Sequence, residues 1–294
     1  MNLTEYARDV FSQSGEDGVI EKILATLPAQ NKWCVEFGAW DGKHLSNTRN
    51  LIENANYSAV LIEADKIKFA ELQNNYSANP NVIPMNAFVG FSPDNNLDTL
   101  LAQTPAPLDF DFLSIDIDGN DYHVWKACAR YRPKLVCIEF NPTIPTEVHF
   151  VQDADPLVKH GSSLHALVEL GQAKQYELVA VSPFNAFFVD AQYFARLDIA
   201  DNRAETLRSD TRYVTFLFSG YDGTVFLAGH SALPWHVFPL NPAKMQSLPR
   251  LLRKFPDDYN SVERWAFRQY RQFISPGEFW QRVRKRLARR ARGA

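Results

Sequence analysis

Short apolar segments alternate with helix-forming segments between residues 14 and 140, and this alternation is the feature that most restricts the possible folds. Five apolar segments have the length of a strand, at 32–37, 58–65, 81–89, 110–117 and 134–140. The segments between them read as helices, at 46–55, 66–78, 96–103 and 121–131. Runs that are apolar throughout, such as 59–62, are what parallel strands covered on both faces require. The pattern therefore predicts a doubly wound α/β fold with a mainly parallel sheet.

Residues 176–191 predict how this sheet ends. They hold two apolar runs separated by Ser-Pro-Phe-Asn, a spacing typical of a hairpin. Five parallel strands and this hairpin give a seven-stranded sheet that ends in an antiparallel pair. A plain dinucleotide-binding domain would end with another parallel strand.

We expect four parts along the chain. Residues 1–29 form an N-terminal helix and lid, with Ser14 as the N-cap of that helix. Residues 30–196 form the Rossmann-like core. Residues 197–239 add an irregular segment and a second hairpin, which the Tyr-Asp-Gly turn within 211–228 indicates. Residues 240–294 form a basic, helical C-terminal extension.

The charge is distributed unevenly along the 294 residues, although the net charge is only −3. Residues 240–294 carry 14 Lys and Arg against 4 Asp and Glu, whereas residues 1–239 carry 17 against 30. The acidic body disfavours nucleic acid as a specific partner, and the basic end predicts peripheral association with an anionic membrane or an acidic partner. We see no signal peptide and no spanning segment in the sequence, so a cytoplasmic location is expected.

The sequence VEFGAWDG, residues 35–42, follows the first predicted strand. Gly38 would let the chain turn tightly under a ligand, and Gly42 would let the next helix approach the sheet. Glu36 lies at the carboxyl end of the strand, where its charge suits a cation such as an amino group. A dinucleotide fingerprint is excluded, because Trp40 stands where its second glycine would be.

The second predicted strand ends in acidic residues. Glu63 follows Gly42 by 21 residues. That is close to the offset of ~20 residues at which an acid binds ribose hydroxyls in nucleotide-binding α/β folds. Asp65 is a second candidate for the same role.

Four blocks in this order resemble the FkbM-like family of S-adenosylmethionine-dependent methyltransferases, which have a class I Rossmann-like fold. The blocks are VEFGAWDG, VLIEAD (60–65), VIPMNAFVG (82–90), and NNLDTLL (95–101) followed by FDFLSIDIDGNDYHVW (110–125). The resemblance implies S-adenosylmethionine as cofactor, with its methionine end on the first turn, its ribose at Glu63 and its adenine beside residues 86–88. The implied cofactor-binding residues are Glu36, Gly38, Ala39, Asp41, Gly42, Glu63, Ala64, Asp65, Asn86, Ala87, Phe88 and Asp116.

The fourth predicted strand runs into a crowd of carboxylates at Asp116, Asp118 and Asp121. Like charges repel, so this crowding costs free energy unless a cation, a ligand or helix N-terminal amides stabilise it. We interpret Asp116 and Asp118 as catalytic residues that contact cofactor and acceptor, and Asp121 as the cap of the next helix. His123 is a candidate base for an acceptor hydroxyl.

Glu139 and Asn141, at the end of the next strand, should converge with Asp116 and Asp118. An all-oxygen set of this kind, above all Asp116, Asp118 and Glu139, suits magnesium or manganese. The sequence therefore predicts methyl transfer from S-adenosylmethionine to a hydroxyl of a sugar or small metabolite, with a small-molecule or glycan acceptor. Two alternatives remain. One is a metal-dependent nucleotide-sugar glycosyltransferase that uses Asp116 and Asp118, and the other is a non-catalytic docking module with the same fold.

Overall fold

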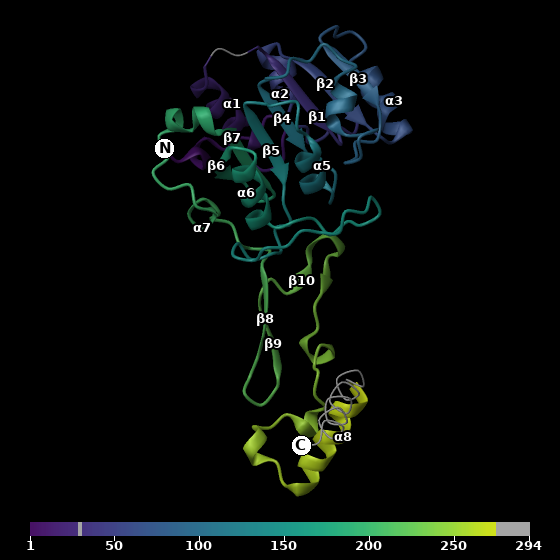
Figure 1. The fold of residues 1–294 in the computed structure, drawn as a ribbon, viewed down its shortest axis with the longest axis vertical. Helices are drawn as coiled ribbons and strands as arrows, with labels where there is room; N and C mark the ends of the chain where they lie inside the picture. Colours follow the sequence, from purple (N-terminus) through teal and green to yellow (C-terminus); the bar gives the residue numbers. More distant parts are fainter. Residues whose placement is uncertain (29–30, 275–294) are drawn as a thin grey trace, which may run out of the picture. The chain divides into compact units, whose positions relative to one another are not determined.

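The computed structural model of the protein describes residues 1–28 and 31–274. The chain divides into two compact units, Met1–Val214 and a second one that begins at Thr215. The first unit contains the sheet and its covering helices (Figure 1). It includes both the N-terminal segment and residues 197–214, so the boundary expected at 196/197 falls inside this unit.

The first unit is built on one seven-stranded sheet (Figure 1). Its strands are β1 (Trp33–Phe37), β2 (Ser58–Glu63), β3 (Val82–Asn86), β4 (Phe112–Ile115), β5 (Leu135–Glu139), β6 (Tyr176–Val181) and β7 (Asn185–Asp190). The order is β3-β2-β1-β4-β5-β7-β6. Strands β1 to β5 pair in parallel, and β7 is antiparallel to both β5 and β6. The predicted sheet, with its antiparallel end, is confirmed.

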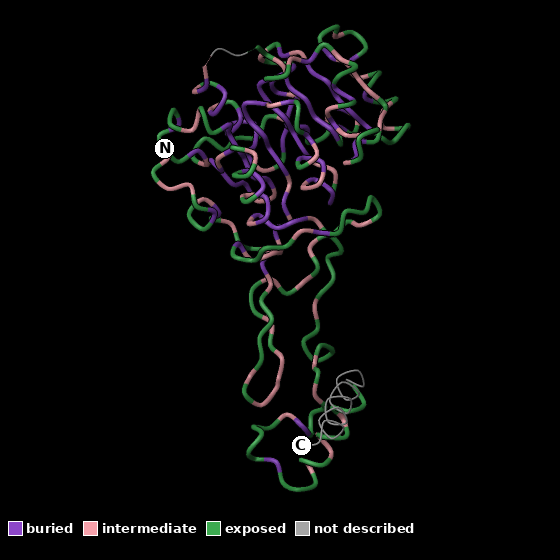
Figure 2. Tube along the Cα trace, viewed as in Figure 1, coloured by how far each residue is buried: buried purple, intermediate pink, exposed green. Residues whose placement is uncertain are grey.

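Helices cover both faces of this sheet, because alternate residues of each strand point to opposite sides. Cys34 and Leu61 belong to the core cluster that holds α1 (Glu16–Thr26), α2 (Arg49–Ala55) and α3 (Lys66–Asn75). Val35 and Ile62 belong to the cluster that holds α4 (Leu97–Leu101), α5 (Asp121–Ala127) and α6 (Leu164–Ala173). Figure 2 shows the strands as the buried centre of this unit. The predicted double winding is therefore confirmed as well.

The N-terminus of the first helix differs from the prediction. Helix α1 begins at Glu16 with Gly15 as its N-cap, and no side chain caps it, so the assignment of Ser14 is wrong. The preceding segment is held instead by Asp17, whose Oδ2 accepts from the backbone N–H of Val10, Phe11 and Ser12. Helix α1 contributes to the core on one face of the sheet. The lid is expected from residues 12–14, and that role stays a prediction.

Short elements complete the first unit. They are the 3₁₀ helices η1 (Leu3–Tyr6) and η2 (Ala191–Leu197) and the short helix α7 (Ala204–Leu207).

The second unit opens with the predicted hairpin. Strands β8 (Thr215–Ser219) and β9 (Val225–Gly229) pair antiparallel, and a two-residue pair β10 (Ala232–Leu233) and β11 (Phe238–Pro239) follows, with η3 (Pro234–His236) between them. Only 3₁₀ turns occur over 240–260: η4 (Pro242–Lys244), η5 (Arg250–Leu252) and η6 (Pro256–Asp258). A regular helix, α8, spans Ser261–Ile274. The rest of the expected helical extension, 275–294, lies outside the described residues.

Candidate functional site

A cavity of about 410 Å³ opens at the carboxyl ends of β1, β2 and β4, the edge at which open α/β sheets bind ligands. Its volume lies within the range of ligand pockets, ~300–1,000 Å³. The lining comes from five stretches of chain and from Gln13. These stretches supply Glu36, Gly38, Ala39, Trp40, His44, Leu45 and Ser46; Ile62, Glu63 and Ala64; Ala87, Phe88 and Val89; Asp116, Ile117, Asp118 and Asn120; and Pro156 and Lys159.

The turn after β1 forms the floor of this cavity. Gly38 has a φ of +73°, and a Cβ atom added to it would lie 1.9 Å from the carbonyl oxygen of Asp116. The N–H of Ala39 donates to the carbonyl oxygen of Ile62 at 3.1 Å, which fixes the turn against β2. The need for glycine at position 38 therefore comes from the backbone that follows β4, and not only from a ligand above the turn.

Glu36 is buried and holds the segment before α2. Its Oε2 accepts from the hydroxyls of Ser46 at 2.6 Å and Thr48 at 2.7 Å, and its Oε1 accepts from the N–H of Asn47 at 3.0 Å. Burial raises the pKa of this carboxyl, although these three hydrogen bonds and a fourth from Ser114 oppose the shift. The sequence analysis assigned 46–48 to a helix, but α2 begins only at Arg49 because these residues bind Glu36.

Glu63 lies where the sequence analysis placed it, at the cavity end of β2. Its Oε2 accepts from the N–H of Trp40 at 2.8 Å, and its Oε1 accepts from the N–H of Asp65 at 2.7 Å. Each oxygen has a second lone pair with which it can accept a hydroxyl. Asp65 itself is the N-cap of α3 and accepts from the N–H groups of Ile67 and Lys68, so its carboxylate serves the helix. Ala64 lines the cavity and Asp65 does not.

Asp41 and Gly42 do not line the cavity but hold its loop in place. Asp41 Oδ1 accepts from the N–H groups of Lys43 and His44. Gly42 has a φ of +72°, and a Cβ atom there would lie 2.7 Å from the ring of Tyr76, whose hydroxyl donates to the Gly42 carbonyl. The expectation that Gly42 admits the next helix is wrong, because its close neighbour is the residue that ends α3.

Of the three residues predicted to border the adenine, one holds two strands together and two line the cavity. Asn86 donates through Nδ2 to the carbonyl oxygen of Glu63 at 2.8 Å, which ties β3 to β2. Ala87 and Phe88 line the cavity, and Phe88 is exposed. Val89 also lines it, although no sequence signal separates this residue from the core.

The carboxylates of Asp116, Asp118 and Glu139 converge as predicted, with oxygens within 4.8 Å of one another. Asp118 is exposed, and its Oδ2 lies 3.9 Å from the Nζ of Lys159. Burial, and then the charges of Asp121 and Asp118, raise the pKa of Asp116 to about 7. Burial and the neighbouring Asp116 also raise the pKa of Glu139. Metal binding stays a prediction, although the oxygen donors fit a hard divalent cation.

Asp121 is expected to serve both the turn at Gly119 and the N-cap of α5, and the structure shows the first role. Its Oδ1 accepts from the N–H of Ile117 at 3.0 Å, and its Oδ2 accepts from the N–H of Gly119 at 2.9 Å. Burial raises its pKa to about 6. The carboxylate thus holds the turn that carries Asp118, which has a φ of +56°. The prediction that Asp121 acts as the cap of α5 is wrong in this respect.

His123 and Asn141 lie beside the cavity without lining it. The Nε2 of His123 is 2.8 Å from the carbonyl oxygen of Gln152, and its ring packs against Phe91. Asn141 donates through Nδ2 to the carbonyl oxygen of His160 and accepts through Oδ1 from Thr143. The catalytic role of His123 stays a prediction that this geometry does not favour.

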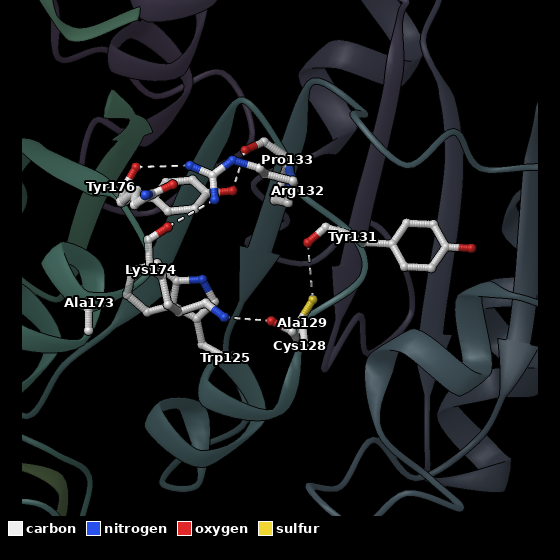
Figure 3. A pocket seen from close by; sticks show the side chains of 10 residues that line it. Trp125, Cys128, Ala129, Tyr131, Arg132, Pro133, Ala173, Lys174 and Tyr176 are labelled. Atoms are coloured by element: carbon white, nitrogen blue, oxygen red, sulfur yellow. Dashed lines mark hydrogen bonds between the residues drawn. The ribbon is translucent and has the colours of Figure 1, made fainter. Parts of the chain in front are cut away.

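A second cavity, of about 310 Å³, lies at the amino ends of β5 and β6, on the opposite edge of the sheet (Figure 3). The guanidinium of Arg132 lies over the ring of Tyr176, pairs with Asp190, and donates to the carbonyl oxygen of Lys174. The Nζ of Lys174 donates to the carbonyl oxygen of Cys128, and burial raises the pKa of that thiol to about 12. These polar groups bind one another, so the first cavity is the better candidate site.

The strand order, with β7 antiparallel between β5 and β6, settles the fold class. The chain has the fold of class I methyltransferases. No family model matches the chain, and no curated protein matches it. Membership of the FkbM-like family therefore stays a prediction.

Several solved structures are similar to the chain at low identity. One is a SAM-dependent methyltransferase from Aquifex aeolicus, with 12% identity and a TM-score of 0.36 over 57% of this chain and 87% of that one. Another is the N-terminal domain of EvdMO1 in the presence of SAH and D-fucose, with 13% identity and a TM-score of 0.39 over 59% and 80%. TrmK of M. capricolum in complex with SAH has 8% identity and a TM-score of 0.36 over 58% and 67%. Likenesses of this size carry no information on the substrate.

Proposed function

We propose that the chain is a methyltransferase that uses S-adenosylmethionine and methylates a hydroxyl of a sugar or another small molecule. The observation that carries the proposal is the cavity that joins the first turn, the carboxylate of Glu63 and Asp116 at the ends of three neighbouring strands. The resemblance of the sequence blocks to FkbM-like methyltransferases supports the choice of cofactor and of a hydroxyl as acceptor.

The lining residues fit this cofactor in charge and in hydrogen-bonding capacity. When bound, S-adenosylmethionine supplies a methyl group on a positively charged sulfonium. Glu36, Glu63, Asp116 and Asp118 make the cavity acidic, which favours a cationic ligand over a polyanion. Glu63 keeps a free lone pair on each oxygen for ribose hydroxyls, since Trp40 and Asp65 occupy only one position each.

The acceptor would lie above Asp116 and Asp118, because these side chains line the cavity beside the first turn. Methyl transfer to oxygen requires alignment of the acceptor and removal of one proton. A carboxylate that is partly desolvated, as Asp116 is, can orient the hydroxyl and take its proton. Lys159, the cation near Asp118, can bind a polar group of the acceptor.

A divalent metal ion is a second way to use the same carboxylates. If one binds, Asp116, Asp118 and Glu139 would hold it, and it would supply positive charge to polarise the acceptor hydroxyl. The convergence of the three carboxylates within 4.8 Å supports this extension of the proposal. Activity that is lost with EDTA and restored with Mg²⁺ or Mn²⁺ would support the metal, and activity indifferent to EDTA would exclude an exchangeable one.

Calorimetric titration of the full chain tests the proposal against its alternatives. S-adenosylmethionine and S-adenosylhomocysteine should bind, whereas UDP-sugars with Mn²⁺ should not. Binding of UDP-sugar but not of S-adenosylmethionine would instead support the glycosyltransferase alternative. A folded chain that binds neither would support the non-catalytic docking module.

A further inference from the structure

The second unit leaves an unusual share of apolar surface uncovered in its described residues, 215–274. Large exposed side chains occur on its hairpin, on its turns and on α8. They are Phe216, Leu217, Phe218, Tyr221, Phe226, Leu233, Trp235, Val237, Phe238, Met245, Leu251, Phe255, Val262, Trp265, Phe273 and Ile274. Large exposed apolar patches mark sites of protein or membrane interaction.

Helix α8 has a defined orientation within this unit. The ring of Phe267 packs against Tyr259 with 5.5 Å between centroids, and the hydroxyl of Tyr270 donates to the carbonyl oxygen of Ser247 at 2.8 Å. These two contacts fix one side of the helix against its own unit. The other sides of α8 are therefore its outer surface.

The outer surface of α8 has an apolar side and a basic side. The helical repeat places Val262, Trp265 and Phe273 together, with exposures of 71%, 60% and 84%. We call these three residues the apolar stripe. The same repeat places Arg264, Arg268 and Arg271 together on another side of the helix, with Arg268 next to Trp265. All three arginines are exposed, although Arg264 also donates to the carbonyl oxygens of Tyr259 and Asp257.

We propose that α8 lies in the headgroup layer of an anionic lipid bilayer, with the apolar stripe directed toward the acyl chains. A helix with Trp and Phe on one side and Arg on the other has the pattern of interfacial membrane helices. None of the helices in the described parts of the chain is both long and apolar enough to cross a membrane. The helix would thus lie on the membrane surface. This inference does not rest on the proposed enzymatic function.

Charge favours a membrane over a second copy of the chain as the occupant of this surface. Residues 240–294 carry 14 Lys and Arg against 4 Asp and Glu, and the surplus extends on both sides of α8. Trp, Phe and Arg are also enriched at protein interfaces. In an isologous contact through α8, however, the basic surface of the second copy would face these arginines, and like charges repel. The headgroup layer offers anionic charge and apolar depth together, and tryptophan is enriched there.

The test is co-sedimentation of the full chain with vesicles of phosphatidylcholine plus phosphatidylserine, and with vesicles of phosphatidylcholine alone. The protein should bind the anionic vesicles, and salt should weaken that binding by screening. The double variant Trp265→Ala/Phe273→Ala should reduce the partition coefficient by ~10-fold or more. The matched control is Ile67→Ala/Leu157→Ala, which removes two exposed apolar residues of the first unit and should bind as the wild type does.

A second pair of variants tests whether vesicle binding depends on the positive charge of α8 itself or on the net charge of the whole chain. Arg268→Gln/Arg271→Gln should weaken binding to anionic vesicles by ~10-fold or more, since each basic residue near the surface contributes. Lys66→Gln/Arg130→Gln changes the net charge equally at exposed sites of the first unit and should have little effect. Fluorescence quenching by brominated lipids should be weaker in Trp265→Phe than in the wild type, because Trp265 reaches the acyl boundary.

Three outcomes would overturn the proposal. Equal binding to vesicles with and without phosphatidylserine would remove the role of the basic side. Equal losses in the α8 variants and in their controls would show that α8 is not the contact. A wild-type chain that ignores vesicles but sediments as a dimer, which Trp265→Ala/Phe273→Ala disperses, would show that a second copy covers the apolar stripe.

Discussion

A Cβ atom on Gly38 would lie 1.9 Å from the carbonyl oxygen of Asp116. The turn after β1 and the segment after β4 are therefore in direct backbone contact at the base of the cavity. This contact ties the cofactor side of the proposed site to its carboxylates. A substitution at Gly38 acts on the fold before it acts on any ligand.

Gly38→Ala should lower the free energy of unfolding by about 3 kcal/mol or more, because it combines a left-handed backbone with a clash against main chain. Gly161→Ala is the matched control. Gly161 also has a positive φ, +69°, but its nearest contact would be the Cβ of Asn141 at 3.1 Å. Its cost should be about 1 kcal/mol. Urea unfolding of both variants checks the difference, and equal costs would refute the role of the Asp116 contact.

Glu63→Ala should weaken S-adenosylmethionine binding by ~10-fold or more, since a hydrogen bond to a charged group contributes about 1.5–3 kcal/mol. Asp65→Asn should leave the affinity nearly unchanged, because Asp65 caps α3 and asparagine also caps helices. Titration calorimetry on both folded variants provides the comparison. If Asp65→Asn loses as much affinity as Glu63→Ala, the assignment of the ribose acid to Glu63 is wrong.

Asp116→Asn and Asp118→Asn should each lower turnover by ~10²-fold or more, the scale of a lost general base or a misplaced acceptor. Affinity for S-adenosylmethionine should fall less. The measurement is formation of S-adenosylhomocysteine with a panel of sugars, with Asp153→Asn as an exposed control. Full turnover in both variants would show that these acids serve only the turn.

Asp121→Ser should be harmful, although serine is a good cap, because the carboxylate accepts from both Ile117 and Gly119. Loss of two buried acceptors should cost about 2–4 kcal/mol of stability. Asp121→Asn keeps one acceptor oxygen and should therefore lose less stability than Asp121→Ser. Thermal unfolding of the wild type and the two variants measures the loss of stability. A loss of less than about 1 kcal/mol in Asp121→Ser would show that Asp121 only caps α5.

The pKa of Glu36 is raised from its usual 4.5 by burial, so the folded chain binds this proton more tightly than the unfolded chain does. The free energy of unfolding therefore falls as the pH rises from about 4.5 through the raised pKa of the folded chain, because Glu36 must then ionise while buried. Below pH 4.5 Glu36 is protonated in both states and has no such effect. Relative to Glu36→Gln, the wild type should lose free energy of unfolding with rising pH across this window. Urea titrations of both chains from about pH 4 to pH 8 measure the difference. A difference that stays constant or grows with pH contradicts the shift.

The sequence by itself determined the fold class and the edge of the sheet that carries the site. Fully apolar runs such as 59–62, alternating with helical segments, are typical of strands covered on both faces, and the carboxyl ends of parallel strands meet at one edge. Glu36, Glu63 and Asp116 stand at the ends of such strands, so their position around one cavity follows from the sequence.

Only the tertiary structure decided which of the acids face a ligand and which face their own backbone. Asp65 and Asp121 lie near strand ends, as Glu63 and Asp116 do, but they do not line the cavity and their carboxylates accept from N–H groups of neighbouring residues. Glu63 also accepts from backbone N–H groups, yet it lines the cavity. The partner of a carboxylate depends on which donors lie within about 3 Å in space, and the direction of a loop that sets this distance is not encoded in spacing alone. The same holds for Gly38, whose requirement comes from Asp116, a residue far away in the sequence but adjacent in the sheet.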